Sequence, residues 1–173
     1  DIAQALLESG ADADAEDNLG KTPVMLVIPE DKREAMYRIL IAHKADVAKK
    51  DAYGDTVLHT ATMTSLAPSI LELLVAGGAD VNARNKDGVS PLLIAVQKRN
   101  FAHVKFYAVR GADINSADKA GDTPLSLALK DGQAMLEMLV NRTNALSHDS
   151  NGNTPLHTAV IVNASIEQIR YLI

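Results

Sequence analysis

Apolar residues recur three and four positions apart in four segments of the chain, and this spacing predicts amphipathic helices. The four sets are Met36, Ile39 and Leu40; Ile70, Leu73 and Leu74; Val104, Tyr107 and Ala108; and Met135, Met138 and Leu139. Each apolar stripe is too large to leave in water and too small to form a core alone. We therefore expect neighbouring helices to stack, so that the stability of the protein is a sum over adjacent interfaces.

Five short Thr- or Ser-containing segments predict the starts of a second set of helices. A Thr or Ser side chain can cap a helix, and a proline directly after it suits the first helical position, where the missing N–H costs nothing. The predicted caps are Thr22, Thr56, Ser90, Thr123 and Thr154. Position 57 is valine where the other four segments have proline. We expect that helix to start more loosely, with its cap retained.

Glycines occur where the stripe-bearing helices are predicted to end. Gly10, Gly78 and Gly111 each precede an Ala-Asp pair, at a place where the chain must turn back and a left-handed residue is favoured. Lys44 takes the same position in another copy and should cost about 1 kcal/mol there. The charged segment 29–34 is predicted to be an exposed loop.

Internal repetition dominates the organisation of the chain. A pattern of Asp or Asn, two variable residues, Gly, one variable residue and then Thr or Ser occurs five times. Its glycines are Gly20, Gly54, Gly88, Gly121 and Gly152, which gives spacings of 34, 34, 33 and 31 residues. Before the last copy, the connection from the preceding alanine has lost two residues. Fixed periods of this length are typical of repeat architectures.

These motifs resemble the ankyrin repeat family, and the resemblance covers essentially the whole chain. It implies an all-α solenoid of stacked helix-turn-helix units with projecting β-hairpin or turn loops. We predict a single ankyrin repeat domain over residues 1–173. Its expected units are a partial repeat at 1–16, full repeats at 17–50, 51–84, 85–117 and 118–148, and a partial repeat at 149–173.

Composition and charge narrow the classes of partner. With 47% hydrophobic and 23% charged residues, the 173-residue chain can bury a sizeable core. A net charge of -5 argues against nucleic acid, which needs a concentrated cationic face. No apolar run reaches the roughly 18–20 residues of a membrane span, so we expect no membrane insertion. There is no cysteine and no visible targeting signal, which favours a cytoplasmic location. We expect a monomer.

The residues that usually carry catalysis form no recognisable pattern in this sequence. The five histidines lack zinc-protease spacing, and there is no phosphate-binding glycine loop or hydrolase nucleophile motif. We therefore expect no enzyme activity, no cofactor and no metal site. His59 and His157 share one repeat position, and the family resemblance implies that they are structural struts bonded within and between repeats. The matching positions elsewhere hold Met25, Leu93 and Ser126, where we expect no strut.

Variable positions within the fixed repeat frame are the candidate binding residues. In the family, loop tips and the inner face of the first helices form a concave groove that grips partners. The candidate partner-binding residues are Leu19, Lys21, Tyr53, Asp55, Lys86, Val89, Lys119, Asp122, Asn151 and Asn153. Tyr53 is the favoured anchor, because aromatic residues are enriched in interfaces. The sequence thus predicts a non-catalytic protein-protein interaction module or scaffold. The alternative is a regulatory segment of a larger enzyme, channel or secreted effector.

Overall fold

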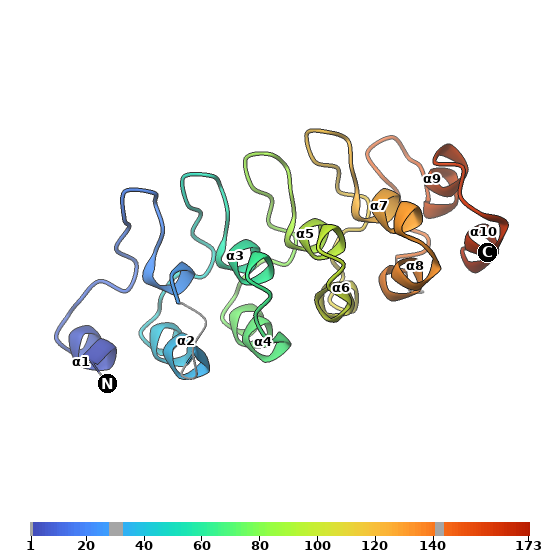
Figure 1. Ribbon diagram of the computed structural model, residues 1–173. Coiled ribbons are helices and arrows are strands. Elements are labelled where there is room, and N and C mark those ends of the chain that lie inside the picture. The colour runs from blue at the N-terminus through green and yellow to red at the C-terminus, as the bar shows by residue number, and fades with distance from the viewer. Residues whose placement is uncertain (1, 28–32, 141–143) are drawn as a thin grey trace. The chain divides into compact units, whose positions relative to one another are not determined.

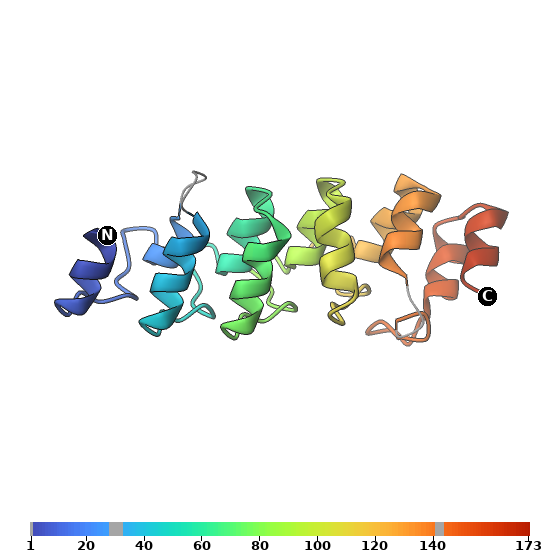
Figure 2. The ribbon, with the colours of Figure 1, turned by 90° about the horizontal axis from the view of Figure 1, so that it is seen from below.

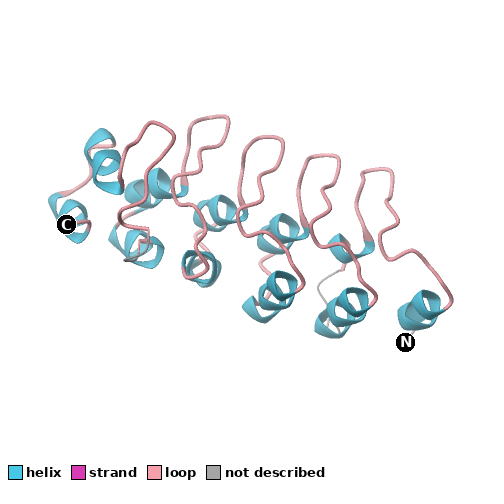
Figure 3. Ribbon diagram, turned by 180° about the vertical axis from the view of Figure 1, so that it is seen from behind, coloured by secondary structure: helices cyan, strands magenta, loops and turns pink. Residues whose placement is uncertain are grey.

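The protein consists of helices joined by turns and loops. A computed structural model describes residues 2–27, 33–140 and 144–173, and within these ranges there is no β-strand (Figure 3). This confirms the predicted all-α class, with turns in the projecting loops. Most of the loop expected at 29–34 lies outside the described residues. The chain divides into two compact units, unit 1 at residues 1–86 and unit 2 at residues 87–173.

Unit 1 is built from two layers of short helices. Its elements are α1 (Ile2–Glu8), the 3-10 turn η1 (Pro23–Met25), α2 (Arg33–Ala42), α3 (Val57–Met63) and α4 (Pro68–Ala76). Helix α3 packs against η1 and α4, and α2 packs against α1 and α4. The loops that precede η1 and α3 project beyond the layer of η1 and α3, on the side away from the layer of α1, α2 and α4 (Figure 1). Leu58, Leu71 and Leu74 are fully buried between the layers.

Unit 2 repeats the same arrangement with three helix pairs. Its elements are α5 (Pro91–Gln97), α6 (Phe101–Ala108), α7 (Pro124–Asp131), α8 (Gln133–Leu139), α9 (Pro155–Ile161) and α10 (Ile166–Tyr171). The first helices contact one another in the order α5, α7, α9, and the second helices in the order α6, α8, α10. Figure 2 shows the paired helices side by side in each repeat. Leu92, Leu125 and Leu136 are fully buried in this core.

The predicted starts of the first helices are confirmed in four of the five repeats. Helices α3, α5, α7 and α9 each begin directly after the expected Thr or Ser. Ser90 Oγ accepts a hydrogen bond from Leu93 N at 3.1 Å, and Thr123 Oγ1 accepts one from Ser126 N at 2.9 Å. The start at Val57 keeps its cap, as expected. Short-range capping chemistry thus places these helices.

The recurrent histidines close capping boxes at the helix starts. Thr56 N donates to Nδ1 of the buried His59 at 3.1 Å, and Thr56 Oγ1 lies 2.9 Å from the same nitrogen. His157 repeats the arrangement on Thr154. The expectation that Ser126 provides no such bond is wrong, because its Oγ accepts from Thr123 N at 3.0 Å. A hydroxyl at the third helical position reaches the cap amide as an imidazole does.

The helix expected after Thr22 is reduced to a single 3-10 turn. Only Pro23–Met25 are helical, and valines at 24 and 27 lower the helix propensity of the segment. Met25 occupies the position of the capping histidine and offers no nitrogen. Thr22 Oγ1 is buried and has no hydrogen-bond partner among the described residues. This repeat therefore lacks the closed cap of its neighbours.

Left-handed turns follow the helices at both expected and unexpected places. Gly10, Gly78 and Gly111 have positive φ angles, and Lys44 adopts the same region at φ 64°, as its alignment with the glycines predicts. A further set was not predicted: Ser65, Arg99 and Asn163, with φ of 54°, 53° and 55°. These three follow α3, α5 and α9 by the same offset. They mark the turn between the two helices of a repeat.

The apolar stripes are wider than their i, i+3, i+4 spacing predicts. Leu71, Phe106 and Leu136 are buried beside the predicted residues, whereas Met138 is 43% exposed. In unit 1, α4 packs against its own first helix, α3, and against α2. In unit 2, α6 and α8 each pack against their own first helix and against the second helix of the next repeat. Two neighbours bury a broader face than one neighbour does.

Candidate functional site

The predicted binding residues lie on five loops, and the tips that begin with an aspartate share one construction. Asp51 Oδ1 accepts hydrogen bonds from Tyr53 N and Asp55 N, both at 2.9 Å. The same pair of bonds forms at Asp17, Asp118 and Asp149. An Asp that bonds the backbone two and four residues on fixes a tight turn. The tip conformation is therefore set by the aspartate and leaves the intervening side chains variable.

Backbone hydrogen bonds join neighbouring tips within each unit. In unit 1, Ala52 N donates to Leu19 O at 2.8 Å, and Lys86 N donates to Tyr53 O at 3.0 Å. In unit 2, Lys119 N donates to Asp87 O at 2.8 Å. Such close approach requires a residue without a side chain at the turn: a Cβ on Gly54 would lie 2.7 Å from Lys86 N. These bonds between neighbouring tips join backbone atoms to backbone atoms.

In unit 1, the structure brings three candidate residues onto adjacent tips. The side chain of Tyr53 is 60% exposed and that of Leu19 is 46% exposed, because only their backbone atoms contribute to the frame. The side chain of Lys86 reaches from the third loop to the second, where its Nζ donates to Ala52 O at 2.7 Å. Lys21 is half-buried, and Asp55 is engaged internally by Asn85 Nδ2 at 2.8 Å. Leu19, Tyr53 and Lys86 therefore present the most available surface.

In unit 2, several candidate residues are occupied by internal contacts. The exception is Asn151, which is exposed and contributes its backbone N–H to the turn. Lys119 Nζ lies 3.3 Å from Asp87, and Asp122 lies 3.3 Å from Lys130 Nζ. The remaining two are half-buried Val89 and Asn153. The ten predicted residues thus fall into two sets, one in each unit, and the unit 2 set is the more internally bonded.

Asn153 also changes the acidity of its own tip. Its Nδ2 donates to Asp149 Oδ2 at 3.0 Å, and its backbone N–H donates to Oδ1 at 2.8 Å. The side-chain bond from Asn153 is the main cause that lowers the pKa of the Asp149 carboxyl below its ordinary value, followed by the backbone bond. This carboxylate is therefore held ionised as part of the turn.

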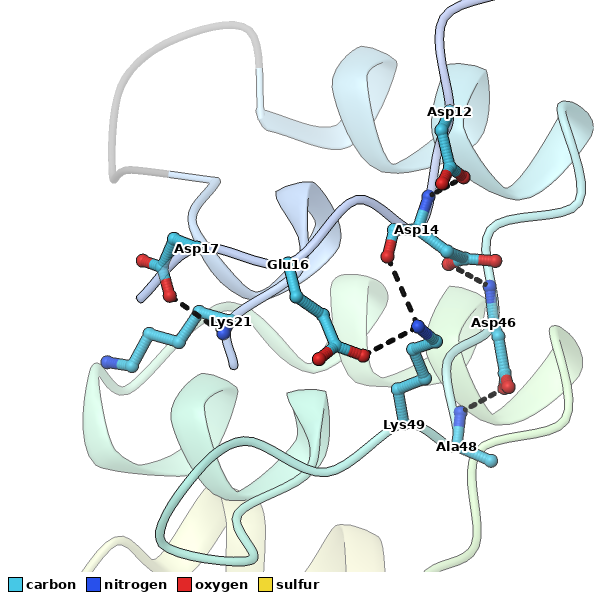
Figure 4. Close-up of polar contacts among 8 residues, drawn as sticks. All are labelled: Asp12, Asp14, Glu16, Asp17, Lys21, Asp46, Ala48 and Lys49. Atoms are coloured by element: carbon cyan, nitrogen blue, oxygen red, sulfur yellow. Dashed lines mark hydrogen bonds and ion pairs between the residues drawn. The ribbon is translucent and has the colours of Figure 1, made fainter. Parts of the chain in front are cut away.

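A lysine outside the predicted set ties the first two loops of unit 1 together. Lys49 Nζ donates to Glu16 Oε1 at 2.7 Å and to Asp14 O at 3.2 Å (Figure 4). The hydrogen bond to Glu16 is the first cause of the raised pKa of Lys49. Asp14 Oδ1 in turn accepts from Asp46 N at 2.8 Å. These acids therefore serve loop-to-loop contacts.

Lys50 is a second lysine that the sequence reasoning missed. Its Nζ donates to Arg84 O at 2.9 Å and so reaches the third loop. The signal was available, since Lys50 directly precedes the tip aspartate Asp51. Lys50 lies before the aspartate, whereas the variable positions that indicate binding follow it.

Within the described residues, no group of three or more His, Asp or Glu residues could hold a metal ion. None of the helices in the described part of the chain is both long and apolar enough to cross a membrane. A hollow of about 510 Å³ in unit 2 is lined by Val109, Ile114, Asn144 and Ser147, among others. Its Ser147 hydroxyl donates to Asn144 O at 2.7 Å and is thus engaged in the loop itself.

The stacked helix pairs and projecting loops define a helical repeat protein. A family model described as ankyrin repeats in three copies matches residues 1–85 and 92–173. The chain belongs to the ankyrin repeat family. The ankyrin repeat is a non-catalytic fold that generally binds other proteins.

The curated relatives are much longer proteins, and each matches this chain over only part of its length. The chain is 35% identical over 95 residues to a B-cell lymphoma 3 protein homolog of Mus musculus, covering 54% of this chain and 21% of that protein. It is 37% identical over 101 residues to a neurogenic locus notch homolog protein 1 of Xenopus laevis, covering 58% and 4%. It is 32% identical over 108 residues to the tyrosine-protein kinase HTK16 of Hydra vulgaris, covering 62% and 14%. The chain therefore spans about a fifth or less of each relative.

Proposed function

We propose that this chain is a protein-interaction module that binds a partner protein through its loop tips and takes no part in catalysis itself. The observation that carries the proposal is the contrast between frame and side chains in unit 1. Tyr53 and Leu19 are 60% and 46% exposed, while their backbone atoms are fixed by hydrogen bonds to neighbouring tips. A loop whose backbone is already ordered loses less conformational entropy on binding than a mobile loop does.

The histidines argue for the same non-catalytic role. His59 and His157 recur in phase, and Nδ1 of each accepts a hydrogen bond from the cap residue three positions earlier. A ring nitrogen engaged in a capping box is unavailable as a general base at that atom. These two histidines stabilise helix starts.

The proposal is tested by affinity capture from cells that express the full-length protein naturally, with two variants as bait alongside the parent chain. The double variant Leu19→Ala, Tyr53→Ala removes the exposed tip side chains and keeps the backbone frame. The control Val109→Ala removes a side chain that is 66% exposed at the end of α6 in unit 2. We expect specific proteins, identified by mass spectrometry, to bind the parent and the control and to be lost from the double variant. Equal capture by all three baits would reject the tip assignment.

A second candidate function is regulation of a larger protein of which this chain is a segment. The match to 14% of the length of a tyrosine-protein kinase shows that repeats of this kind occur in a chain named for an enzymatic activity. In that case the partner surface would lie in the same polypeptide. Cross-linking from position 53 in the full-length protein distinguishes the two functions. A cross-link within the same polypeptide indicates an internal partner, and a cross-link to another protein indicates an external one.

A further inference from the structure

Two lysines cross the seam between the second and third loops of unit 1 in opposite directions. Lys50 Nζ donates to Arg84 O at 2.9 Å, and Lys86 Nζ donates to Ala52 O at 2.7 Å. An ammonium group has three N–H donors, so each lysine has two N–H groups left after its bond to the carbonyl oxygen. Both side chains belong to exposed residues. The seam therefore holds two positive charges at fixed positions.

These two charges differ from those of Lys49, Lys119 and Lys130 in having no counter-anion among the described residues. Lys49 is paired with Glu16 at 2.7 Å, and Lys119 and Lys130 are paired with carboxylates at 3.3 Å. Neither Lys50 nor Lys86 forms an ion pair with a described residue. The tip aspartate beside them, Asp51, is buried and turns its Oδ1 to two backbone amides. Carbonyl oxygens orient the two ammonium groups without neutralising them.

The two lysines flank the exposed aromatic ring proposed as the anchor. Lys86 N bonds to Tyr53 O, and Lys86 Nζ bonds to the residue before Tyr53. Arg84 lies two residues before Lys86, a span of at most about 7 Å along the backbone. The ammonium of Lys50 is bonded to Arg84 at one end of this short span, and Tyr53 is bonded to Lys86 at the other end. Cationic and apolar contacts are available side by side.

We propose that this seam, formed by Lys50, Lys86 and Tyr53, binds an acidic segment of the partner protein, with acidic side chains on the lysines and an apolar side chain on Tyr53. The inference rests on the proposed function and deepens it by naming the partner's chemistry. Acidic residues at alternate positions of an extended segment are about 7 Å apart, which suits charges held over a two-residue span. Opposite charge at an interface favours association and register.

Two other occupants fit less well. Nucleic acid needs a concentrated cationic face, whereas this seam offers two lysines in a chain of net charge -5. A second copy of this chain carries Asp12, Asp14 and Glu16 at alternate positions. However, Asp14 and Glu16 are already bound to Asp46 N and Lys49 Nζ of their own chain. We therefore do not assign the acidic segment to residues 12–16 of a second copy of this chain.

The test measures binding of a fluorescent synthetic peptide with alternating Glu and Leu residues to the 173-residue chain by anisotropy. The double variant Lys50→Gln, Lys86→Gln is compared with the charge-matched control Lys44→Gln, Lys105→Gln, which removes two exposed lysines that lie outside the loop tips. We expect about fivefold weaker binding in the first variant and less than about twofold in the control, as two exposed charge pairs would give. Raising the salt concentration should weaken parent binding. Circular dichroism establishes that both variants are folded.

Four results would overturn the inference. They are absence of binding to the parent, equal loss in both double variants, equal affinity for a peptide with Gln in place of Glu, and clearly tighter binding of a phosphoserine peptide, which would assign the seam to phosphate. Should the glutamate peptide fail while capture that depends on Leu19 and Tyr53 persists, the acidic-segment inference falls and the interaction module stands. Loss of both would reject the two proposals together.

Discussion

Replacing Thr22 with valine should stabilise the protein, although threonine is a favoured helix cap. The Thr22 side chain is buried, and its hydroxyl has no hydrogen-bond partner among the described residues. It forms no side-chain cap bond to the turn that follows. Valine has nearly the same shape and replaces the hydroxyl with a methyl group. The backbone at φ -88° and ψ 162° is extended and accommodates a β-branched residue.

The expected gain follows from the desolvation of the unpaired hydroxyl. Leaving a buried polar group unsatisfied costs about 1–3 kcal/mol, and valine removes that cost. Allowing for imperfect packing, we expect the free energy of unfolding to rise by about 1–2 kcal/mol. With a urea m-value of about 2 kcal/mol/M, the midpoint should rise by roughly 0.5–1 M.

The matched control is Thr56→Val, the same substitution one repeat later. Thr56 is equally buried and has a similar backbone at φ -90° and ψ 173°, but its Oγ1 lies 2.9 Å from Nδ1 of His59. Loss of this cap contact should destabilise the protein by about 0.5–2 kcal/mol. Urea unfolding followed by circular dichroism gives both values, and hydrogen exchange at the amides of Met25 and Leu26 reports this repeat separately. A lower midpoint for Thr22→Val, or a change of the same sign in both variants, would refute the reasoning.

Three further changes test the turns and tips. Ser65→Gly should stabilise by about 1 kcal/mol, because Ser65 has a left-handed φ of 54°, and a thermal midpoint that does not rise would count against this. Gly54→Ala should lower the free energy of unfolding, measured in urea, by about 1–3 kcal/mol more than Gly121→Ala does. Both glycines have positive φ, but of the two only Gly54 would place a Cβ within 4 Å of backbone atoms. Equal losses in the two variants would contradict the close approach. The Asp149 pKa is lowered in the fold, so its stabilising contribution is present above the ordinary carboxyl pKa and is lost as the pH falls through the lowered value. Asn153→Ala should raise that pKa toward its ordinary value in an NMR titration, and an unchanged pKa would reject the assigned cause.

Most starts of the first helices could be predicted because their causes are local in sequence. A Thr or Ser before proline supplies the cap within three residues, as Ser90 does for Leu93. The left-handed turn at Lys44 follows from its alignment with glycines. The unpaired Thr22 hydroxyl was harder to foresee, because it depends on Met25 at the position that holds histidine or serine elsewhere. The wider buried face at Leu71 depends on contacts between helices of different repeats.

The binding residues could be proposed from sequence, but their availability could not. Variation at a fixed repeat position indicates that a side chain is unnecessary for the frame, and Tyr53 is indeed exposed. Variation says nothing about whether a charged side chain meets a partner within its own chain. Lys119 and Asp122 are both paired in unit 2, whereas Lys86 contacts only a carbonyl oxygen. These differences arise from distances between separate loops, which single-sequence patterns do not encode.

In this protein the atoms that hold the fold differ from those that we propose for recognition, so family membership leaves the partner unspecified. The tips are held by backbone amides, tip aspartates and the glycine turn, as in the bonds that join Leu19, Ala52 and Tyr53. Side chains between these elements can therefore change with little effect on stability, since exposed substitutions away from such contacts usually alter it by less than about 0.5 kcal/mol. Selection can then act on those side chains for binding alone. The unneutralised lysines of the seam are the kind of feature that such selection leaves, because they contribute charge to the surface without an ion pair that stabilises the fold.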